Sequence, residues 1–123
     1  MPLLNTILVV DDSPVVAKTL SFLIQKAGYN VLSADDGSDA LALFDGRDID
    51  LVFTDLNMPN MNGIQLIEQV RKHHDYKYIP IVLFVADNEN DRQELMKSSR
   101  ATMLLDKSNI KEKLIPTIKK LIN

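Results

Sequence analysis

The chain contains no cysteine. This absence excludes a disulfide framework, a thiolate metal site and a cysteine nucleophile. No apolar run approaches the ~18 residues that a transmembrane helix needs, and the amino terminus lacks the basic and then apolar segments of a secretory signal. We therefore expect a soluble, cytoplasmic protein without a membrane partner.

The length and the composition are those of an ordinary globular protein. The chain has 123 residues, of which 46% are hydrophobic and 25% charged. A chain of this size buries roughly two-thirds of its unfolded surface, so its core is large enough to stabilise it without disulfides or a structural metal. We expect residues 1–123 to form a single domain.

Charge is distributed unevenly along the chain. Residues 1–60 carry a net charge of -6 and residues 61–123 a net charge of +3, which together give the formal charge of -3. A net acidic chain with dispersed lysines is a poor candidate for binding a phosphate backbone, so we expect no direct contact with nucleic acid. The acidic half contains nine aspartates between positions 11 and 55, and most of these fit turns and helix caps.

Short apolar runs alternate with segments of helical periodicity. Strands are expected at Ile7–Val10, Tyr29–Ala34, Leu51–Phe53, Ile79–Val85 and Met103–Leu105. Helices are expected from Ser13-Pro14 to Gly28, around Ala40–Phe44, after Gly63, over 89–98 and around Ile110–Ile122. Pro116 predicts a kink in the last helix or a late start of that helix. This alternation predicts an α/β fold with a doubly wound, five-stranded parallel sheet and five helices.

Two of the most apolar strands end in aspartate. Ligands of such sheets bind beyond the carboxyl ends of the strands, so Asp11, Asp12 and Asp55 converge if the first and third strands are neighbours. Three carboxylates repel one another unless a cation compensates, and Mg²⁺ is the natural choice. Lys107 follows the fifth strand and is able to reach the same edge. Carboxylates, Mg²⁺ and one ammonium suit the binding or transfer of a phosphoryl group, with an aspartate as a possible nucleophile.

Each of these residues also has a simpler interpretation. Taken singly, Asp11 and Asp12 fit a helix cap, Asp55 fits a turn and Lys107 fits an exposed surface. If all of those interpretations held, the charged residues at three strand ends would share one edge of the sheet only by coincidence. The combination therefore favours a functional site.

At these positions the sequence resembles the response-regulator receiver domain of two-component signalling, from about Thr6 to Leu121. The resemblance implies the flavodoxin-like strand order 2-1-3-4-5. It is carried by Val9-Val10-Asp11-Asp12-Ser13, Asp55-Leu56-Asn57-Met58-Pro59, Met61-Asn62-Gly63, Ile79-Pro80-Ile81-Val82 and Lys107.

The resemblance also implies a role for each site residue. Asp55 accepts a phosphoryl group from a phosphohistidine of a sensor histidine kinase or a histidine phosphotransfer protein. Asp12 binds Mg²⁺ directly, Asp11 does so mainly through water, and Asn57 offers its backbone carbonyl. Lys107 pairs with a phosphoryl oxygen. Such a domain relays a signal by contact with a downstream protein that the sequence does not identify, and it is not an enzyme with turnover on a small molecule.

Four positions depart from the family pattern. Receivers usually have serine or threonine where this chain has Val85, and an aromatic residue where it has Leu104, so the usual conformational switch is in question. The proline that usually follows the lysine is Ser108, which predicts a trans Lys107–Ser108 peptide bond. Arg100 stands where glycine is usual, which predicts a differently built turn.

Two alternatives remain open. A pseudo-receiver, which acts purely by protein contact, is favoured by Val85 and Leu104. A Mg²⁺-dependent phosphohydrolase with a nucleophile on the first strand needs a second aspartate two residues further on, whereas Asp11 is followed by Asp12-Ser13. The phosphohydrolase also needs a cap domain, for which the sequence offers no candidate.

Overall fold

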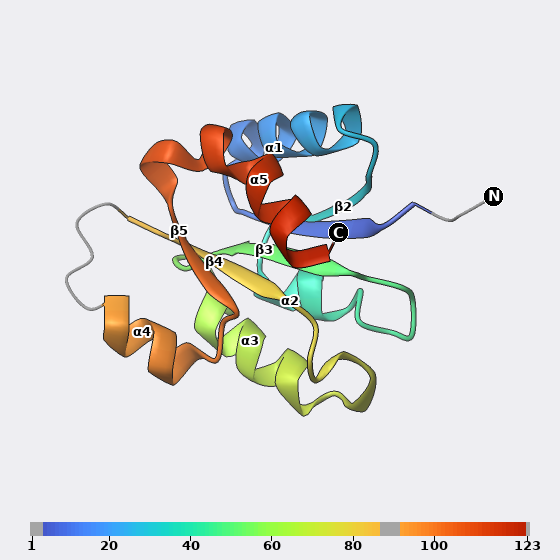
Figure 1. The fold of residues 1–123 in the computed structure, drawn as a ribbon. Coiled ribbons are helices and arrows are strands. Elements are labelled where there is room, and N and C mark those ends of the chain that lie inside the picture. The colour runs from blue at the N-terminus through green and yellow to red at the C-terminus, as the bar shows by residue number, and fades with distance from the viewer. Residues whose placement is uncertain (1–3, 87–91, 123) are drawn as a thin grey trace.

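The computed structural model describes residues 4–86 and 92–122. Five parallel strands form one sheet in the order β2-β1-β3-β4-β5, as predicted (Figure 1). The strands are β1 (Thr6–Val10), β2 (Asn30–Ala34), β3 (Leu51–Asp55), β4 (Ile81–Val85) and β5 (Met103–Asp106). The helices are α1 (Pro14–Lys26), α2 (Gly37–Leu41), α3 (Gly63–Lys72), α4 (Arg92–Ser99) and α5 (Ile110–Ile122), with short 3₁₀ turns η1 (His74–Tyr76) and η2 (Lys107–Asn109).

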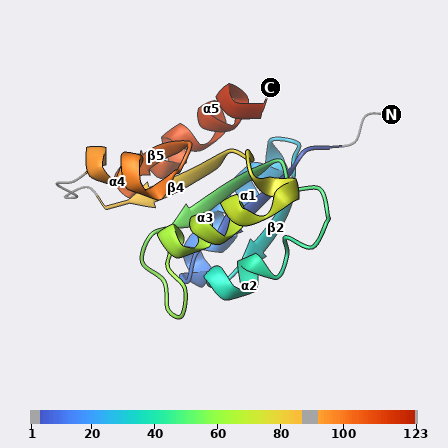
Figure 2. The same cartoon turned by 90° about the horizontal axis from the view of Figure 1, so that it is seen from below.

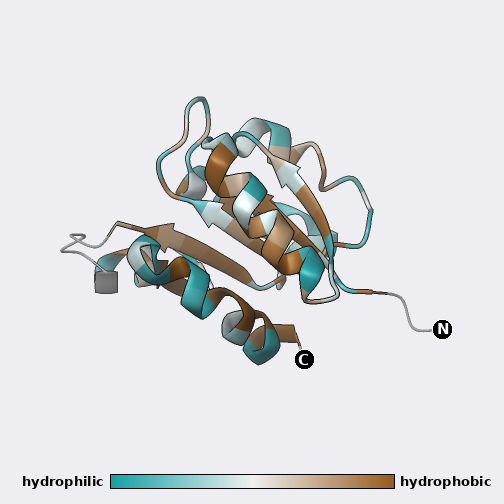
Figure 3. Cartoon of the chain, turned by 90° about the horizontal axis from the view of Figure 1, so that it is seen from above, coloured by the Kyte–Doolittle hydropathy of each residue, from teal (hydrophilic) through white to brown (hydrophobic). Residues whose placement is uncertain are grey.

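Helices cover both faces of the sheet. Helices α1 and α5 lie on one face, and α2, α3 and α4 lie on the other (Figures 1 and 2). A separate apolar cluster fills each interface, so β1, β3 and β4 are buried from both sides. Figure 3 shows apolar central strands between helices of mixed hydropathy. Burial on both faces explains why these strands read as continuous apolar runs in the sequence.

Several element boundaries differ from the predicted ones. Strand β4 begins at Ile81 rather than Ile79, because Pro80 has no N–H to donate to a strand ladder. Helix α2 ends at Leu41. Beyond Ala42 the amides bond three residues back and tighten the chain, as in the bond from Phe44 N to Leu41 O (3.1 Å). Part of the predicted helix at 89–98 lies outside the described residues.

Helix α5 begins well before its proline. The helix starts at Ile110, six residues ahead of Pro116, so the late start, one of the two predicted alternatives, does not occur. A proline is poorly tolerated this far inside a helix, because it has no N–H for the helical hydrogen bond. The kink at Pro116 stays a prediction.

The turn between α4 and β5 depends on two arginines. Arg100 has a φ of 61°, the left-handed conformation that favours glycine. The prediction that this turn is built differently is therefore wrong. Arg71, which is buried on α3, donates to the Arg100 carbonyl from Nη2 (3.1 Å) and to the Ile79 carbonyl from Nη1 (2.6 Å). Burial, followed by the nearby charge of Arg100, lowers the pKa of Arg71. The bond from Nη2 thus anchors the carbonyl of Arg100, the residue with the positive φ, to α3.

We expect Arg100→Gly to stabilise the fold. Glycine adopts a positive φ without the steric penalty of about 1–2 kcal/mol that other residues pay, and the substitution also removes a charge beside Arg71. The greater freedom of glycine in the unfolded chain offsets about 0.4–1 kcal/mol of this gain. Urea unfolding should show a free energy of unfolding about 0.5–1 kcal/mol higher than that of the wild type. A loss of stability would show that the turn is unstrained.

Tyr76 closes the amino edge of the sheet, opposite the aspartates. Its buried hydroxyl donates to the Arg47 carbonyl (2.6 Å) and accepts from the Gly46 amide (2.8 Å). Its ring meets Phe44 edge to face, with centroids 4.9 Å apart. The tyrosine thus joins η1 to the loop that leads into β3.

No helix in the described part of the chain has the length and apolar character that a bilayer crossing requires.

Candidate functional site

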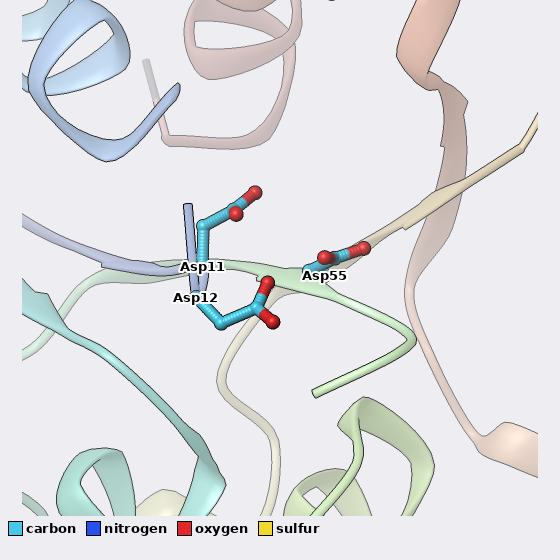
Figure 4. A group of neighbouring side chains, drawn as sticks. All are labelled: Asp11, Asp12 and Asp55. Carbon is cyan, nitrogen blue, oxygen red and sulfur yellow. The ribbon is translucent and has the colours of Figure 1, made fainter. Parts of the chain in front are cut away.

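Three aspartates meet at the carboxyl edge of the sheet. Asp11 and Asp12 follow β1, and Asp55 ends the neighbouring β3. One carboxylate oxygen from each lies within 4.8 Å of the others, and Figure 4 shows the three side chains gathered at these strand ends. The structure therefore brings together the three aspartates that the sequence singled out.

Asp11 is the most deeply placed of the three. Its side chain is held by the amide of Ser13, which donates to Oδ1 at 2.9 Å, and the residue is only 1% exposed. Its Oδ2 is buried and has no hydrogen-bond partner among residues 4–86 and 92–122. Burial, and then the charges of Asp55 and Asp12, raise the pKa of Asp11 despite the bond from Ser13. A cation between these carboxylates would reduce their mutual repulsion and would give the unpaired Oδ2 of Asp11 a partner.

Asp55 forms an ion pair with Lys107. Asp55 is 3% exposed, and its Oδ1 accepts from the Leu56 amide and from Lys107 Nζ, both at 2.8 Å. Burial lowers the pKa of Lys107, but the hydrogen bond to Asp55 and the surrounding carboxylates outweigh it, so the pKa lies above its ordinary value. Lys107 therefore brings a permanent positive charge across the end of β4 to Asp55.

Gly63 determines how closely α3 approaches Asp55. The Gly63 amide donates to the Leu56 carbonyl at 2.9 Å. A Cβ at position 63 would overlap the carbonyl oxygen of Asp55 and lie 2.8 Å from Leu83 Cδ1. Asn62 begins the helix through a capping box with Gln65. The final glycine of the motif is thus needed for space beside the candidate nucleophile.

The loop after β3 is tied to the start of α2. Asn60, with a φ of 68°, donates from Nδ2 to Asp36 Oδ2 at 3.0 Å. The Gly37 amide donates to the Met61 carbonyl at 3.3 Å. Hydrogen bonds from the Asp39 amide and then from Asn60 lower the pKa of Asp36. Asn57 lies in this loop, two residues beyond Asp55. That its carbonyl faces the acidic pocket, formed by Asp11, Asp12 and Asp55, stays a prediction.

The two switch positions, Val85 and Leu104, carry apolar side chains that pack in or against the core. Val85 is fully buried at the end of β4, where it lies opposite Asp106 of β5. Leu104 is partly buried and packs against the same apolar cluster that contains Val85. Neither side chain has a donor for a phosphoryl oxygen.

The backbone after Lys107 is trans. No cis peptide bond occurs among residues 4–86 and 92–122, which confirms the prediction for Lys107–Ser108.

Two contributions to the site were not predicted: the space provided by Gly63, and the cap that Asp106 forms on the Ser108 amide (3.1 Å). The pattern Asp-x-Ser is a signal for such a turn.

Proteins of known function and solved structures resemble this chain in sequence and in fold. The chain is 37% identical over 94 residues to the CAI-1 autoinducer sensor kinase/phosphatase CqsS of Vibrio cholerae, covering 76% of this chain but only 14% of that protein. Its fold is similar to that of chemotaxis protein CheY4 of Vibrio cholerae, with a TM-score of 0.90, 32% identity and coverage of 98% and 100% of the two chains. It is also similar to the response regulator TrrA of Thermotoga maritima in complex with Mg²⁺ and BeF (TM-score 0.82, 31% identity, 96% and 99% covered).

The similarity extends over almost the whole sequence. The family model for the response regulator receiver domain matches residues 7–119. The matched span begins in β1 and ends in α5, and it includes all three aspartates and Lys107. The chain therefore belongs to the response regulator receiver domain family.

Proposed function

We propose that this receiver, as one domain over residues 1–123, accepts a phosphoryl group on Asp55 from a phosphohistidine of a sensor histidine kinase or a histidine phosphotransfer protein. The observation that carries the proposal is the ion pair between Lys107 Nζ and Asp55 Oδ1 (2.8 Å) beside the carboxylates of Asp11 and Asp12. A nucleophilic carboxylate with a fixed cation beside it is suited to phosphoryl transfer.

The residues of the pocket fit a magnesium ion. Mg²⁺ prefers oxygen ligands and is commonly held by a few carboxylates, and the buried, unpartnered Oδ2 of Asp11 offers such an oxygen. The similar response regulator TrrA is described with Mg²⁺ and BeF. Asp11, Asp12, Asp55 and the backbone carbonyl of Asn57 would hold the ion. When bound, it would neutralise carboxylate and phosphoryl oxygens.

The chain's own residues then supply the rest of the reaction. A carboxylate oxygen of Asp55 attacks phosphorus, the P–N bond of the phosphohistidine breaks, and its electron pair returns to the imidazole. Lys107, already charged, stabilises the negative oxygens of the group in transit. Asp55 is oriented by the Leu56 amide and cannot turn away from the pocket without losing that bond.

The partners follow from the same proposal. A sensor kinase as the donor is supported by the similarity to CqsS. The output is contact with a downstream protein rather than turnover of a substrate. Cleavage of phosphate esters is not expected, because the first strand is followed by Asp11-Asp12-Ser13, which lacks an aspartate two residues beyond Asp11.

Intact-mass spectrometry tests the phosphoacceptor directly. After incubation with Mg²⁺ and phosphoramidate, the wild type should gain the mass of one phosphoryl group. Asp55→Asn should gain none, because an amide is a far weaker nucleophile than a carboxylate. Addition of a chelator should abolish the wild-type adduct. An adduct of equal yield on Asp55→Asn would place the reaction on another residue.

The pseudo-receiver is the second candidate, and one observation favours it. Val85, which is buried in the core, and Leu104, which packs against the same cluster, fill the switch positions with apolar side chains. A pseudo-receiver would show no adduct in the same mass measurement, whatever the concentration of Mg²⁺ or phosphodonor. The experiment therefore separates the two candidates.

A further inference from the structure

We propose that Asp106 is a positioning residue that holds Lys107 on Asp55, in place of a proline after the lysine. The inference rests on the proposed function, because it assigns a part in phosphorylation to a residue outside the acidic pocket. Asp106 ends β5, and Lys107 is the first residue of η2. The pair brackets the point where the chain leaves the sheet.

One carboxylate oxygen of Asp106 reaches past the lysine. Asp106 Oδ1 accepts from the Ser108 amide (3.1 Å) and from the Ser108 hydroxyl (3.0 Å). The residues before and after Lys107 are therefore tied to each other. Such a cap fixes the backbone of the residue between them, and hence the direction of its Cα–Cβ bond.

Lys107 needs this constraint because of where it starts. Strand β4 separates β5 from β3, so Lys107 must cross the end of β4 to bring Nζ within 2.8 Å of Asp55 Oδ1. Its side chain is 43% exposed, so packing alone does not hold it. A proline at position 108 would restrict the backbone through its ring, whereas Ser108 leaves φ free. Asp106 supplies by hydrogen bonding the restriction that the ring would have supplied.

The test compares initial rates of Asp55 phosphorylation by phosphoramidate at saturating Mg²⁺ in the 123-residue chain. Asp106→Ala removes the acceptor and should lower the rate about tenfold, since a small misplacement of a catalytic group is costly. Asp106→Asn loses the charge but keeps a capping oxygen, and it should stay within about twofold of the wild type. Asp45→Ala is the matched control, because Asp45 Oδ1 accepts from the Arg47 amide (3.3 Å) with the same spacing at the opposite edge. That variant should keep the wild-type rate.

A double-mutant cycle distinguishes positioning from a general structural effect. If Asp106 acts through Lys107, then Asp106→Ala should change the rate less than about twofold in a Lys107→Ala background. A tenfold loss in both backgrounds would overturn the proposal. So would a wild-type rate for Asp106→Ala, or a loss in Asp106→Asn as large as that in Asp106→Ala.

Lysine labelling decides the question without phosphorylation. The amine of Lys107 should react with an acetylating ester about tenfold faster in Asp106→Ala than in the wild type, because the ion pair with Asp55 loosens. Lys111, an exposed lysine on α5, serves as the internal standard. Unchanged labelling of Lys107 would refute the inference. If the wild type takes no phosphoryl group but labelling changes as expected, the proposed function fails while the positioning role stands.

Discussion

Gly63→Ala should lower the free energy of unfolding by about 3 kcal/mol, at the upper end of the usual cost of overpacking. The new methyl group would overlap the carbonyl oxygen of Asp55 and meet Leu83 Cδ1 at 2.8 Å. The first obstacle is backbone in a buried strand, so it cannot swing away as a flexible side chain would. Either α3 or the end of β3 must therefore move. Urea unfolding measures the loss.

The same substitution should slow phosphorylation of the molecules that remain folded. Displacement of the Asp55 backbone by about 1 Å would lower the rate about 100-fold. Gly28→Ala is the control, because Gly28 also lies at a helix end but has a φ of 101°. A Cβ added there would meet no atom of the described residues within 4 Å. That variant should lose about 1–2 kcal/mol from backbone strain alone and keep the wild-type rate. Equal rates for Gly63→Ala and the wild type would show that α3 does not position Asp55.

Phosphorylation of Asp55 should change the conformation of this receiver only weakly. Val85 has no hydroxyl with which to bind a phosphoryl oxygen, and a ligand shifts an equilibrium only through its differential affinity for the two states. One charge-assisted hydrogen bond is worth about 1.5–3 kcal/mol. Its loss would reduce the population shift by roughly 10- to 150-fold. Leu104, packed in the same cluster as Val85, has no polar group to exchange partners during a switch.

NMR shift mapping with Mg²⁺ and beryllofluoride, which mimics a phosphoryl group on Asp55, measures this response. Shift changes should be confined to the acidic pocket and to the adjoining loops at Asn57–Asn62 and 87–90, the second of which lies outside the described residues. Large changes across β5 and α5 would contradict the expectation. The double variant Val85→Thr, Leu104→Tyr should extend the changes into β5, since it restores both a hydroxyl and an aromatic ring. Leu104→Tyr alone is the matched control and should not.

The sequence predicts the gathering of the three aspartates because a simple rule of parallel sheets applies to them. Asp11 directly follows one buried strand and Asp55 ends another, and the carboxyl ends of parallel strands in one sheet share an edge. The position of Lys107 follows from the same rule. What the sequence does not contain is the distance between the lysine and Asp55, which depends on the hydrogen bonds of Asp106 in the turn after β5.

Other features had no clear signal in the sequence. Arg71 follows Ile67 by four residues and so lies on the buried face of α3, where a long basic side chain is rare. It binds three backbone carbonyls there. Arg100 adopts a positive φ that is rare for a long side chain. Both depend on contacts between α3 and the turn before β5, and local propensity carries no information about such contacts.

The buried position of Tyr76 determines what the fluorescence of this ring would report. The chain has no tryptophan and only three tyrosines, and Tyr76 is fixed at the amino edge by Arg47 and Gly46. Emission from this ring follows global unfolding, while chemistry at the opposite edge leaves its surroundings unchanged. An optical assay of the acidic pocket therefore calls for an installed fluorophore. Met58, three residues after Asp55, is a suitable place for a tryptophan.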